Sequence, residues 1–356
     1  MFELCLTKVY LNKYKLTIVK INYLESLRGI ASMMIVILHA SLFTPYLKNF
    51  NFIQNSYLFV DFFFVLSGFV ISYKYLYNLK NKNDFIKFIK KRFLRLYPLH
   101  FFLLIVYLFF DYFQNYLGYQ FEINFNNLYS FFANLTLTHA LIPDLGRSFN
   151  TVSWSISVEF YTYILFALII IFISSIRLII FISIALIFLS NFFLLDTGFN
   201  FNYSHNQILR CINGFFQGVL IYNFYKKINF NNKYFLYLIL FFLFLILNIE
   251  SLSNLLQISF VFFVSAAIFS LLKKQNKIVI ALLEHKYLIF LGKISYSTYM
   301  SHYIFAVGIK YLLLMINFNL NDKLIYQFIL LLAYLSTVIL FSNITYLLIE
   351  KKFYKK

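Results

Sequence analysis

The sequence predicts an all-α protein that crosses a membrane many times. Of its 356 residues, 62% are hydrophobic and only 12% are charged, whereas soluble domains carry about 25% charged residues. Long apolar runs alternate with short clusters of Lys and Arg along the whole chain. Because about 20 apolar residues in a helix span a bilayer, we expect these runs to be transmembrane helices.

The apolar runs predict a bundle of about ten transmembrane helices. They are expected near residues 30–46, 57–76, 96–117, 153–173, 178–195, 207–225, 233–249, 255–272, 288–316 and 324–348. Basic clusters mark the cytoplasmic side of a membrane protein, and they fall on one side when both chain termini are placed in the cytoplasm. The exceptions are Lys48, Arg147, Arg210, Lys310 and Lys323.

We expect one membrane domain over residues 1–356, with a basic cytoplasmic segment at 1–28 and no C-terminal soluble domain. Residues 118–152 are expected to be extracytoplasmic or interfacial. Within them, the amphipathic stretch Leu128 to Leu141 is expected to be an interfacial helix rather than one that dips into the bundle. The formal net charge of +18 reflects membrane topology, so no nucleic acid partner is expected. Cys5 and Cys211 show no metal-ligand spacing and are not expected to form a disulfide, so no bound metal is predicted.

Arg28 and His39 are the first chemical candidates. They stand eleven positions apart in an apolar run, which places them on one helix face about 16 Å apart along the axis. Arg28 then lies near a membrane surface and His39 deep below it. An ionisable group at that depth indicates a functional site. The alternative is a neutral histidine that donates a hydrogen bond to a neighbouring helix.

Basic residues precede the third apolar run, where Arg92 and Arg95 are three positions apart and so neighbours on a helix. Paired guanidinium groups bind phosphate or carboxylate oxygens with two hydrogen bonds each. The alternative is an anchor to lipid headgroups. Arg92, Arg95 and Arg28 are predicted on the same membrane face, where a phosphate-rich cytoplasmic ligand would contact all three. Lys91 is a further candidate for this ligand.

Two carboxylates are predicted near the opposite face, Asp61 at the start of the second run and Glu159 at the start of the fourth. Either one would orient the His39 ring or stabilise its charged form. Trp154 is the only tryptophan, and it is expected either as an interfacial anchor or as a platform for a substrate. The neighbouring candidates for substrate binding are Ser157 and Tyr161.

A second histidine, His302, is predicted within the ninth span at a depth comparable to that of His39. The hydroxyl residues before it, Ser295, Ser297 and Ser301, also suit close helix packing. We include His302 among the candidate substrate-binding residues. The remaining histidines, His100, His139, His205 and His285, fall near predicted boundaries or in loops, and no role is assigned to them. The sequence carries no Walker loop, dinucleotide fingerprint, HExxH or CxxC motif.

Together these segments resemble the acyltransferase-3 family of integral membrane O-acyltransferases. The agreement holds in order as well as content for Leu27 to His39, Val60 to Phe69, Arg92 to Arg95, Ser153 to Tyr161, Gly292 to His302, and Ile349-Glu350. The chain departs from the family where Glu25-Ser26 replaces an Asp-Gly and where Lys351-Lys352 follows the closing glutamate. Neither departure touches a candidate catalytic position.

The resemblance implies transfer of an acyl group, most often acetyl from acetyl-CoA, to a hydroxyl of a cell-envelope or exported glycan, free or lipid-linked. It places the protein among membrane lipids, in the bacterial inner membrane, with acyl-CoA as donor substrate and no permanently bound cofactor. Coenzyme A carries phosphates that need cations, and a sugar hydroxyl needs a base. We therefore expect the coenzyme at Arg28, Lys91, Arg92 and Arg95, with His39 as general base. Asp61 or Glu159 would orient the imidazole or bind the acceptor. The sequence does not choose between direct transfer and a transient acyl-enzyme.

Two other functions fit the same residues less well. A proton-coupled transporter or flippase of envelope precursors would use His39, Asp61 and Glu159 as a proton path. Such transporters often show repeated halves and helices broken by Gly or Pro, but this chain has 9 Gly and 3 Pro and no internal repeat. A non-enzymatic scaffold would leave the buried charges without a purpose.

Overall fold

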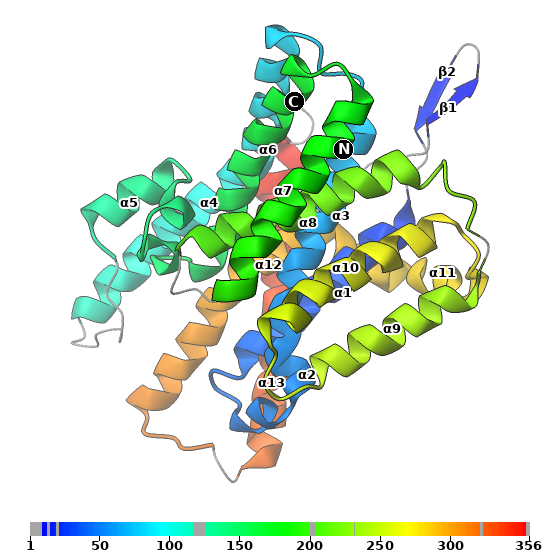
Figure 1. Ribbon diagram of the computed structural model, residues 1–356. Coiled ribbons are helices and arrows are strands. Elements are labelled where there is room, and N and C mark those ends of the chain that lie inside the picture. Colours follow the sequence, from blue (N-terminus) through cyan, green and yellow to red (C-terminus); the bar gives the residue numbers. More distant parts are fainter. Residues whose placement is uncertain are drawn as a thin grey trace.

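The computed structural model describes residues 9–12, 15–18, 21–116, 126–199, 204–230, 232–320 and 323–353. Nearly all of this part is helical, which confirms the predicted all-α class. A short antiparallel hairpin of β1 (Val9–Asn12) and β2 (Lys15–Ile18) precedes the helices and stands away from them (Figure 1). Cys5 lies outside the described residues, and Cys211 is a buried free thiol.

Ten helices of 14 or more residues occur in the described part, and each overlaps one of the ten predicted runs. They are α1 (Asn22–Ala40), α3 (Phe59–Tyr75), α4 (Lys82–Tyr116), α6 (Trp154–Phe172), α7 (Ile176–Thr197), α8 (Ser204–Phe224), α9 (Tyr234–Leu247), α10 (Asn254–Leu272), α12 (Lys286–Met315) and α13 (Leu324–Thr345). The short helices are α2 (Asn51–Gln54), α5 (Leu128–Leu135), α11 (Lys277–Leu283) and α14 (Lys351–Phe353).

Within the described residues, seven helical segments are long and apolar enough to cross a membrane. They contain α1, α3, α4, α6, α7, α10 and α13. Helix α8 is long, but it carries buried polar side chains at Asn206, Gln207, Arg210, Asn213 and Gln217. These side chains face other helices instead of lipid, so this interior helix is less apolar than its neighbours. The number of spans and the side on which the termini lie remain predictions.

Two helices begin earlier than predicted. Helix α1 starts at Asn22 instead of residue 30, so the last part of the expected basic segment 1–28 forms its first turns, where Glu25 and Arg28 lie 3.8 Å apart as an ion pair. Helix α4 starts at Lys82 instead of residue 96 and continues through Pro98. A hydropathy window finds only the apolar part of a helix, whereas these basic first turns have ordinary helix propensity.

The expected helix from Leu128 to Leu141 is only half right. Helix α5 begins with a capping box, in which the Asn127 side chain and the Ser130 backbone are 2.8 Å apart. It ends at Leu135, because Leu137 adopts a φ of 57° that an α-helix does not allow. The chain then turns inward, so that His139 and Ala140 are fully buried. An apolar face of α5 is exposed, but the segment after it enters the bundle.

Glycines allow two pairs of helices to approach closely. A Cβ atom at Gly292 of α12 would lie 2.1 Å from the Glu25 carbonyl oxygen of α1, and one at Gly29 would lie 2.6 Å from the Gly292 nitrogen. A Cβ atom at Gly68 of α3 would likewise lie 1.8 Å from the Phe215 carbonyl oxygen of α8. Small residues at such contacts are typical of membrane helix pairs. They bring α1 against α12 and α3 against α8.

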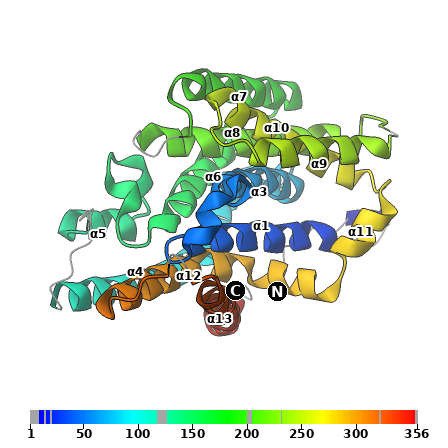
Figure 2. The ribbon, with the colours of Figure 1, turned by 90° about the horizontal axis from the view of Figure 1, so that it is seen from below.

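The bundle is built in layers, which Figure 2 shows from below. Helices α8, α9 and α10 lie beside one another beneath α7, followed by α3 and α6, then α1, then α12 and finally α13. Apolar side chains on outer helices are exposed, including Phe181 and Phe188 on α7 and Ile325 on α13, as expected of lipid-facing surfaces. The interior between α1, α3, α4, α6 and α12 contains a cavity.

Candidate functional site

A cavity lies among five helices, and the space within it and its open mouth together is about 950 Å³. Its lining residues from α1 and α3 are Arg28, Val60, Phe63, Phe64, Leu66, Ser67, Val70, Ile71, Lys74 and Tyr75. Those from α4, α6 and α12 are Arg92, Arg95, Leu96, Ser155, Ile156, Glu159, Tyr163, Ser295, Tyr296 and Tyr299.

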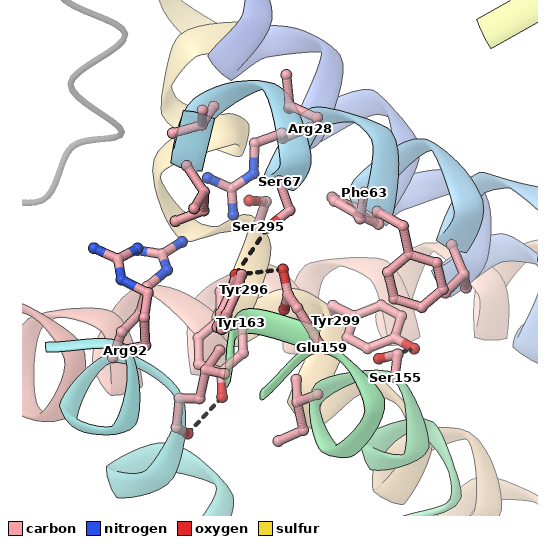
Figure 3. A pocket seen from close by; sticks show the side chains of 18 of the residues that line it. Arg28, Phe63, Ser67, Arg92, Ser155, Glu159, Tyr163, Ser295, Tyr296 and Tyr299 are labelled. Atoms are coloured by element: carbon pink, nitrogen blue, oxygen red, sulfur yellow. Dashed lines mark hydrogen bonds between the residues drawn. The ribbon is translucent and has the colours of Figure 1, made fainter. Parts of the chain in front are cut away.

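Four cations from three helices line one part of the cavity, namely Arg28, Lys74, Arg92 and Arg95. The Arg92 guanidinium donates to the Tyr75 hydroxyl at 3.2 Å and lies 5.3 Å from the centre of the Tyr75 ring. Arg28 is held by its ion pair with Glu25. Figure 3 shows Arg28 and Arg92 on the same side of the cavity. Arg28 and Arg92 are therefore held at the cavity wall, where an anion can reach them.

The structure thus brings three of the four residues predicted to bind the coenzyme to one cavity. The fourth, Lys91, is exposed and does not line it. Lys74 does line it but was not among the sequence candidates. Its position at the end of the second predicted run, on the same membrane face as Arg28, is the signal that could have identified it.

A carboxylate and two hydroxyls lie further inside the cavity (Figure 3). The Tyr163 hydroxyl donates to Glu159 Oε1 at 2.6 Å, and Ser67 Oγ lies 2.8 Å from the Tyr163 oxygen. Because Tyr163 has a single proton, Ser67 donates to it. In the described structure, the buried Ser295 hydroxyl in the same wall has no hydrogen-bond partner. Glu159 therefore lies in the same space as the cations.

Asp61, the other candidate carboxylate, is not in the cavity. Arg210 on α8 contacts it with two nitrogens, at 2.7 and 3.2 Å, and both side chains are buried. The Arg210 guanidinium carbon lies 5.0 Å from the centre of the Trp154 ring and 4.6 Å from that of Phe199. Trp154 is only 4% exposed, so it is not an interfacial anchor. It covers a buried ion pair.

Sequence reasoning missed Arg210, which it treated only as an exception to the charge bias. A lone arginine in an apolar run requires a buried anion, since an unpaired charge there is very costly. This requirement could have identified Arg210 as one half of a buried ion pair. The sequence offers two carboxylates, Asp61 and Glu159, as the partner of Arg210. Spacing alone does not choose between them.

His39 and His302 lie side by side at the contact of α1 and α12. Nδ1 of His39 is 3.0 Å from Nε2 of His302 and 3.0 Å from the Ile35 carbonyl oxygen. Nδ1 of His302 is 3.1 Å from the Thr298 carbonyl oxygen. His302 is fully buried, whereas His39 is partly exposed and its ring meets Tyr303 edge-on at 5.1 Å. The partner of His39 is thus a second histidine, and neither Asp61 nor Glu159 contacts it in the described structure.

The histidine pair lies behind the cavity wall. His39 does not line the cavity, but Tyr299 does, and the centre of its ring is 6.0 Å from that of His302. The Tyr299 hydroxyl accepts from Ser155 at 2.9 Å and donates to the Val152 carbonyl oxygen at 2.9 Å. Tyr299 therefore stands between the space that holds Glu159 and the imidazoles.

The two remaining candidates hold the segment after α5. Ser157 donates to the Leu137 carbonyl oxygen at 2.5 Å, and Tyr161 donates to that of Thr136 at 3.2 Å. Neither residue lines the cavity. Among the described residues, no three His, Cys, Asp or Glu side chains come together as a metal site would require.

Two histidines without an assigned role are buried here, His139 within this segment and His100 against it. The rings of His100 on α4 and His139 are parallel, with centres 5.7 Å apart. His100 Nε2 lies 2.9 Å from the Asn134 carbonyl oxygen, and His139 Nε2 lies 3.0 Å from Ser153 Oγ. Burial lowers the pKa of His139 to about 3, with the neighbouring His100 adding to the effect.

The C-terminal motif also reaches the bundle interior. Glu350 is buried and accepts a hydrogen bond from Ser297 of α12. The segments Gly292 to His302 and Ile349-Glu350, far apart in the sequence, are therefore neighbours in the fold.

Comparison with protein-family models identifies the family. The model of the acyltransferase-3 family, described as an acyltransferase domain, matches residues 21–346. No curated protein and no solved structure matches the chain. The matched range includes every cavity-lining residue and both histidines of the pair.

Proposed function

Because this chain belongs to the acyltransferase-3 family, as its motifs predicted, we propose that it transfers an acetyl group from acetyl-CoA to a hydroxyl of a cell-envelope or exported glycan. The observation that carries the proposal is the cavity, which has four cations in one part, the Glu159 carboxylate in another, and an imidazole pair behind the Tyr299 wall. We place the protein in the bacterial inner membrane, with the cations toward the cytoplasm.

The donor would bind with its phosphates at Arg28, Lys74, Arg92 and Arg95. Guanidinium groups suit phosphate oxygens because each one offers two parallel hydrogen bonds. The pantetheine arm would extend past Glu159 and Tyr163 toward Tyr299. Because His39 does not line the cavity, the Tyr299 side chain would have to move aside for the thioester to reach it. Support for this direction is that Arg28 and His39 lie at different places along α1, one near its start and the other near its end.

His39 would act as the general base through Nε2, the ring nitrogen that contacts neither His302 nor Ile35. The acceptor oxygen attacks the thioester carbonyl carbon while its proton moves to His39 Nε2. The carbon–sulfur bond then breaks, and the thiolate takes that proton from the imidazolium. The products are the ester and free coenzyme A, and His39 returns to its starting state.

The two carboxylates would have different tasks. Glu159 faces the cavity, so we assign it to binding the acceptor or aligning it in the cavity. Asp61 would act indirectly, by holding α3 against α8 through Arg210. Trp154 would shield this pair, and Ser157 and Tyr161 would fix the segment after α5.

The transporter alternative has less support. It requires His39, Asp61 and Glu159 to form one proton path, but in the described structure each has a different partner: His302, Arg210 and Tyr163. These contacts do not join the three residues to one another.

Purified protein in nanodiscs with radiolabelled acetyl-CoA tests the proposal. We expect label to move to a glycan acceptor fraction, with release of one free thiol for each acetyl group transferred. Empty nanodiscs are the control. If the thioester remains intact with every hydroxyl acceptor while the protein moves protons or glycan across vesicles, the transferase proposal fails.

A further inference from the structure

His302 is the only side chain that hydrogen-bonds the His39 ring in the described part of the chain. It is fully buried, and the rings are 4.9 Å apart between centres with a 55° tilt. The two residues come from helices that Gly29 and Gly292 bring together. Tyr334 of α13 also lies within reach of both helices, with its hydroxyl 3.4 Å from the Val36 carbonyl oxygen and 3.3 Å from that of His302.

Backbone carbonyls determine which nitrogen of each ring carries its proton. A carbonyl oxygen only accepts, so Nδ1 of His302 donates to Thr298 and its Nε2 has a lone pair. Nδ1 of His39 faces the Ile35 carbonyl, so it also carries a proton. That proton points between the Ile35 oxygen and the His302 Nε2 lone pair. The reverse arrangement would direct a lone pair at a carbonyl oxygen in both rings.

We propose that His302 is the positioning residue of the acyl-transfer reaction, and that its Nε2 holds His39 in the tautomer whose Nε2 is the base. This rests on the proposed function. His302 takes the place that a carboxylate occupies in many catalytic triads, where the third group orients the imidazole and stabilises its charged form.

His39 and His302 return to their starting protonation states after one reaction cycle. When His39 Nε2 accepts the hydroxyl proton, the imidazolium still donates from Nδ1 to neutral His302. His302 keeps its own Nδ1 proton, which it donates to the Thr298 carbonyl oxygen. When the thiolate takes the proton from His39 Nε2, both rings return to their starting tautomers. A neutral acceptor avoids a second buried charge in a region where an unpaired carboxylate would be costly.

A purely structural role for His302 makes a different prediction from a positioning role. If the ring only fills space, a side chain of similar size restores function whatever its hydrogen bonding. If Nε2 acts as acceptor, a glutamine restores function better than a leucine, because its Oε1 can occupy the position of Nε2. The comparison of His302→Gln with His302→Leu therefore separates the two roles.

The test measures kcat and KM for acetyl-CoA in wild type, His302→Gln and His302→Leu, with His100→Gln and His100→Leu as matched controls. His100 is another buried histidine that hydrogen-bonds a backbone carbonyl, but it does not contact His39. We expect His302→Leu to lower kcat on the order of 100-fold, with little change in KM. His302→Gln should recover about tenfold of that loss, and the His100 variants should keep kcat within about threefold of wild type.

A second readout does not depend on activity. In protein labelled with ¹⁵N-histidine, the His39 signal, assigned by its loss in His39→Ala, should show a protonated Nδ1 and an unprotonated Nε2. In His302→Leu it should shift toward a mixture of tautomers. A wild-type signal from an Nε2–H tautomer would overturn the proposal, as would equal kcat values for the Gln and Leu variants.

The two readouts separate this inference from the proposed function. If the wild type transfers no acetyl group but the tautomer shifts as expected, the pairing stands and the reaction assignment fails. If transfer is robust and His302→Leu keeps wild-type kcat, the reaction stands and the positioning role fails. If His302→Leu does not fold, His302→Gln and the wild-type spectrum decide the question.

Discussion

Arg210 on α8 and Asp61 on α3 form a two-contact ion pair in the protein interior, with nitrogen–oxygen distances of 2.7 and 3.2 Å. Both residues are buried, and the aromatic rings of Trp154 and Phe199 cover the guanidinium. Breaking such a pair leaves one charge uncompensated in a dry environment. This cost is usually larger than the net contribution of the intact pair to stability.

Single changes in this pair should therefore be more harmful than a double change. We expect Asp61→Asn or Arg210→Met to lower the free energy of unfolding by about 3–5 kcal/mol. The double variant should recover most of that loss, because no unpaired charge remains. Thermal unfolding in detergent measures all three, and a double variant less stable than either single one would contradict the pairing.

Removal of the cavity guanidiniums should affect donor binding more than chemistry. We expect Arg92→Ala and Arg95→Ala each to raise the KM for acetyl-CoA about 10- to 100-fold, since a hydrogen bond to a charged group contributes roughly 1.5–3 kcal/mol. Lys91→Ala is the matched control. It removes a neighbouring cation that is exposed and outside the cavity, so its KM should stay within about twofold of wild type. Equal effects of all three changes would instead favour a general electrostatic anchor.

The contact between α1 and α12 offers a test of close packing. In Gly292→Ala the new Cβ would lie 2.1 Å from the Glu25 carbonyl oxygen, so α12 must move away from α1 and separate His302 from His39. We expect a lower unfolding temperature and at least about tenfold lower kcat. Gly308→Ala is the control on the same helix, where a Cβ would meet nothing within 4 Å. It should be neutral or slightly stabilising, and equal damage from both changes would refute the packing argument.

His139 should make the protein sensitive to acid. Its pKa is lowered to about 3 in the folded protein, by burial first and by His100 second, whereas the unfolded chain has a pKa of about 6.5. The neutral ring is thus favourable for folding above pH 6.5, and stability falls as the pH drops from 6.5 toward 3. At pH 5 the loss is on the order of 2 kcal/mol.

Unfolding temperatures between pH 7 and pH 4.5 check this expectation. The decrease in unfolding temperature over this pH range should be smaller in His139→Gln than in wild type, because glutamine does not titrate. This holds whatever the stability of the variant at pH 7. Parallel pH curves for the two proteins would show that His139 does not carry the acid sensitivity.

Local sequence patterns were sufficient for the helices and for much of the cavity. All ten predicted runs overlap long helices, because hydropathy depends on nearby residues only. Arg92 and Arg95 were identified by their helical spacing, and the structure places both in the cavity with Arg28. The starts of α1 and α4 were placed too late, because their first turns are polar and hydropathy does not detect them.

Contacts between distant helices could not be predicted in the same way. His39 and His302 are 263 positions apart, and the pairing depends on how closely Gly29 and Gly292 allow their helices to approach. Asp61 and Arg210 are separated by 149 positions. For both, the sequence shows that a buried group needs a partner, but the partner is chosen by packing.

The central claim is that His39 is the base for acyl transfer, and the His39→Ala variant tests it most directly. The measurement is the rate of labelled acetyl transfer at saturating acetyl-CoA, together with the affinity for the donor and the unfolding temperature. We expect the rate to fall by about 100-fold or more, with donor affinity and folding retained, because the cationic part of the cavity is untouched. A His39→Ala protein that transfers acetyl groups at the wild-type rate would contradict the account.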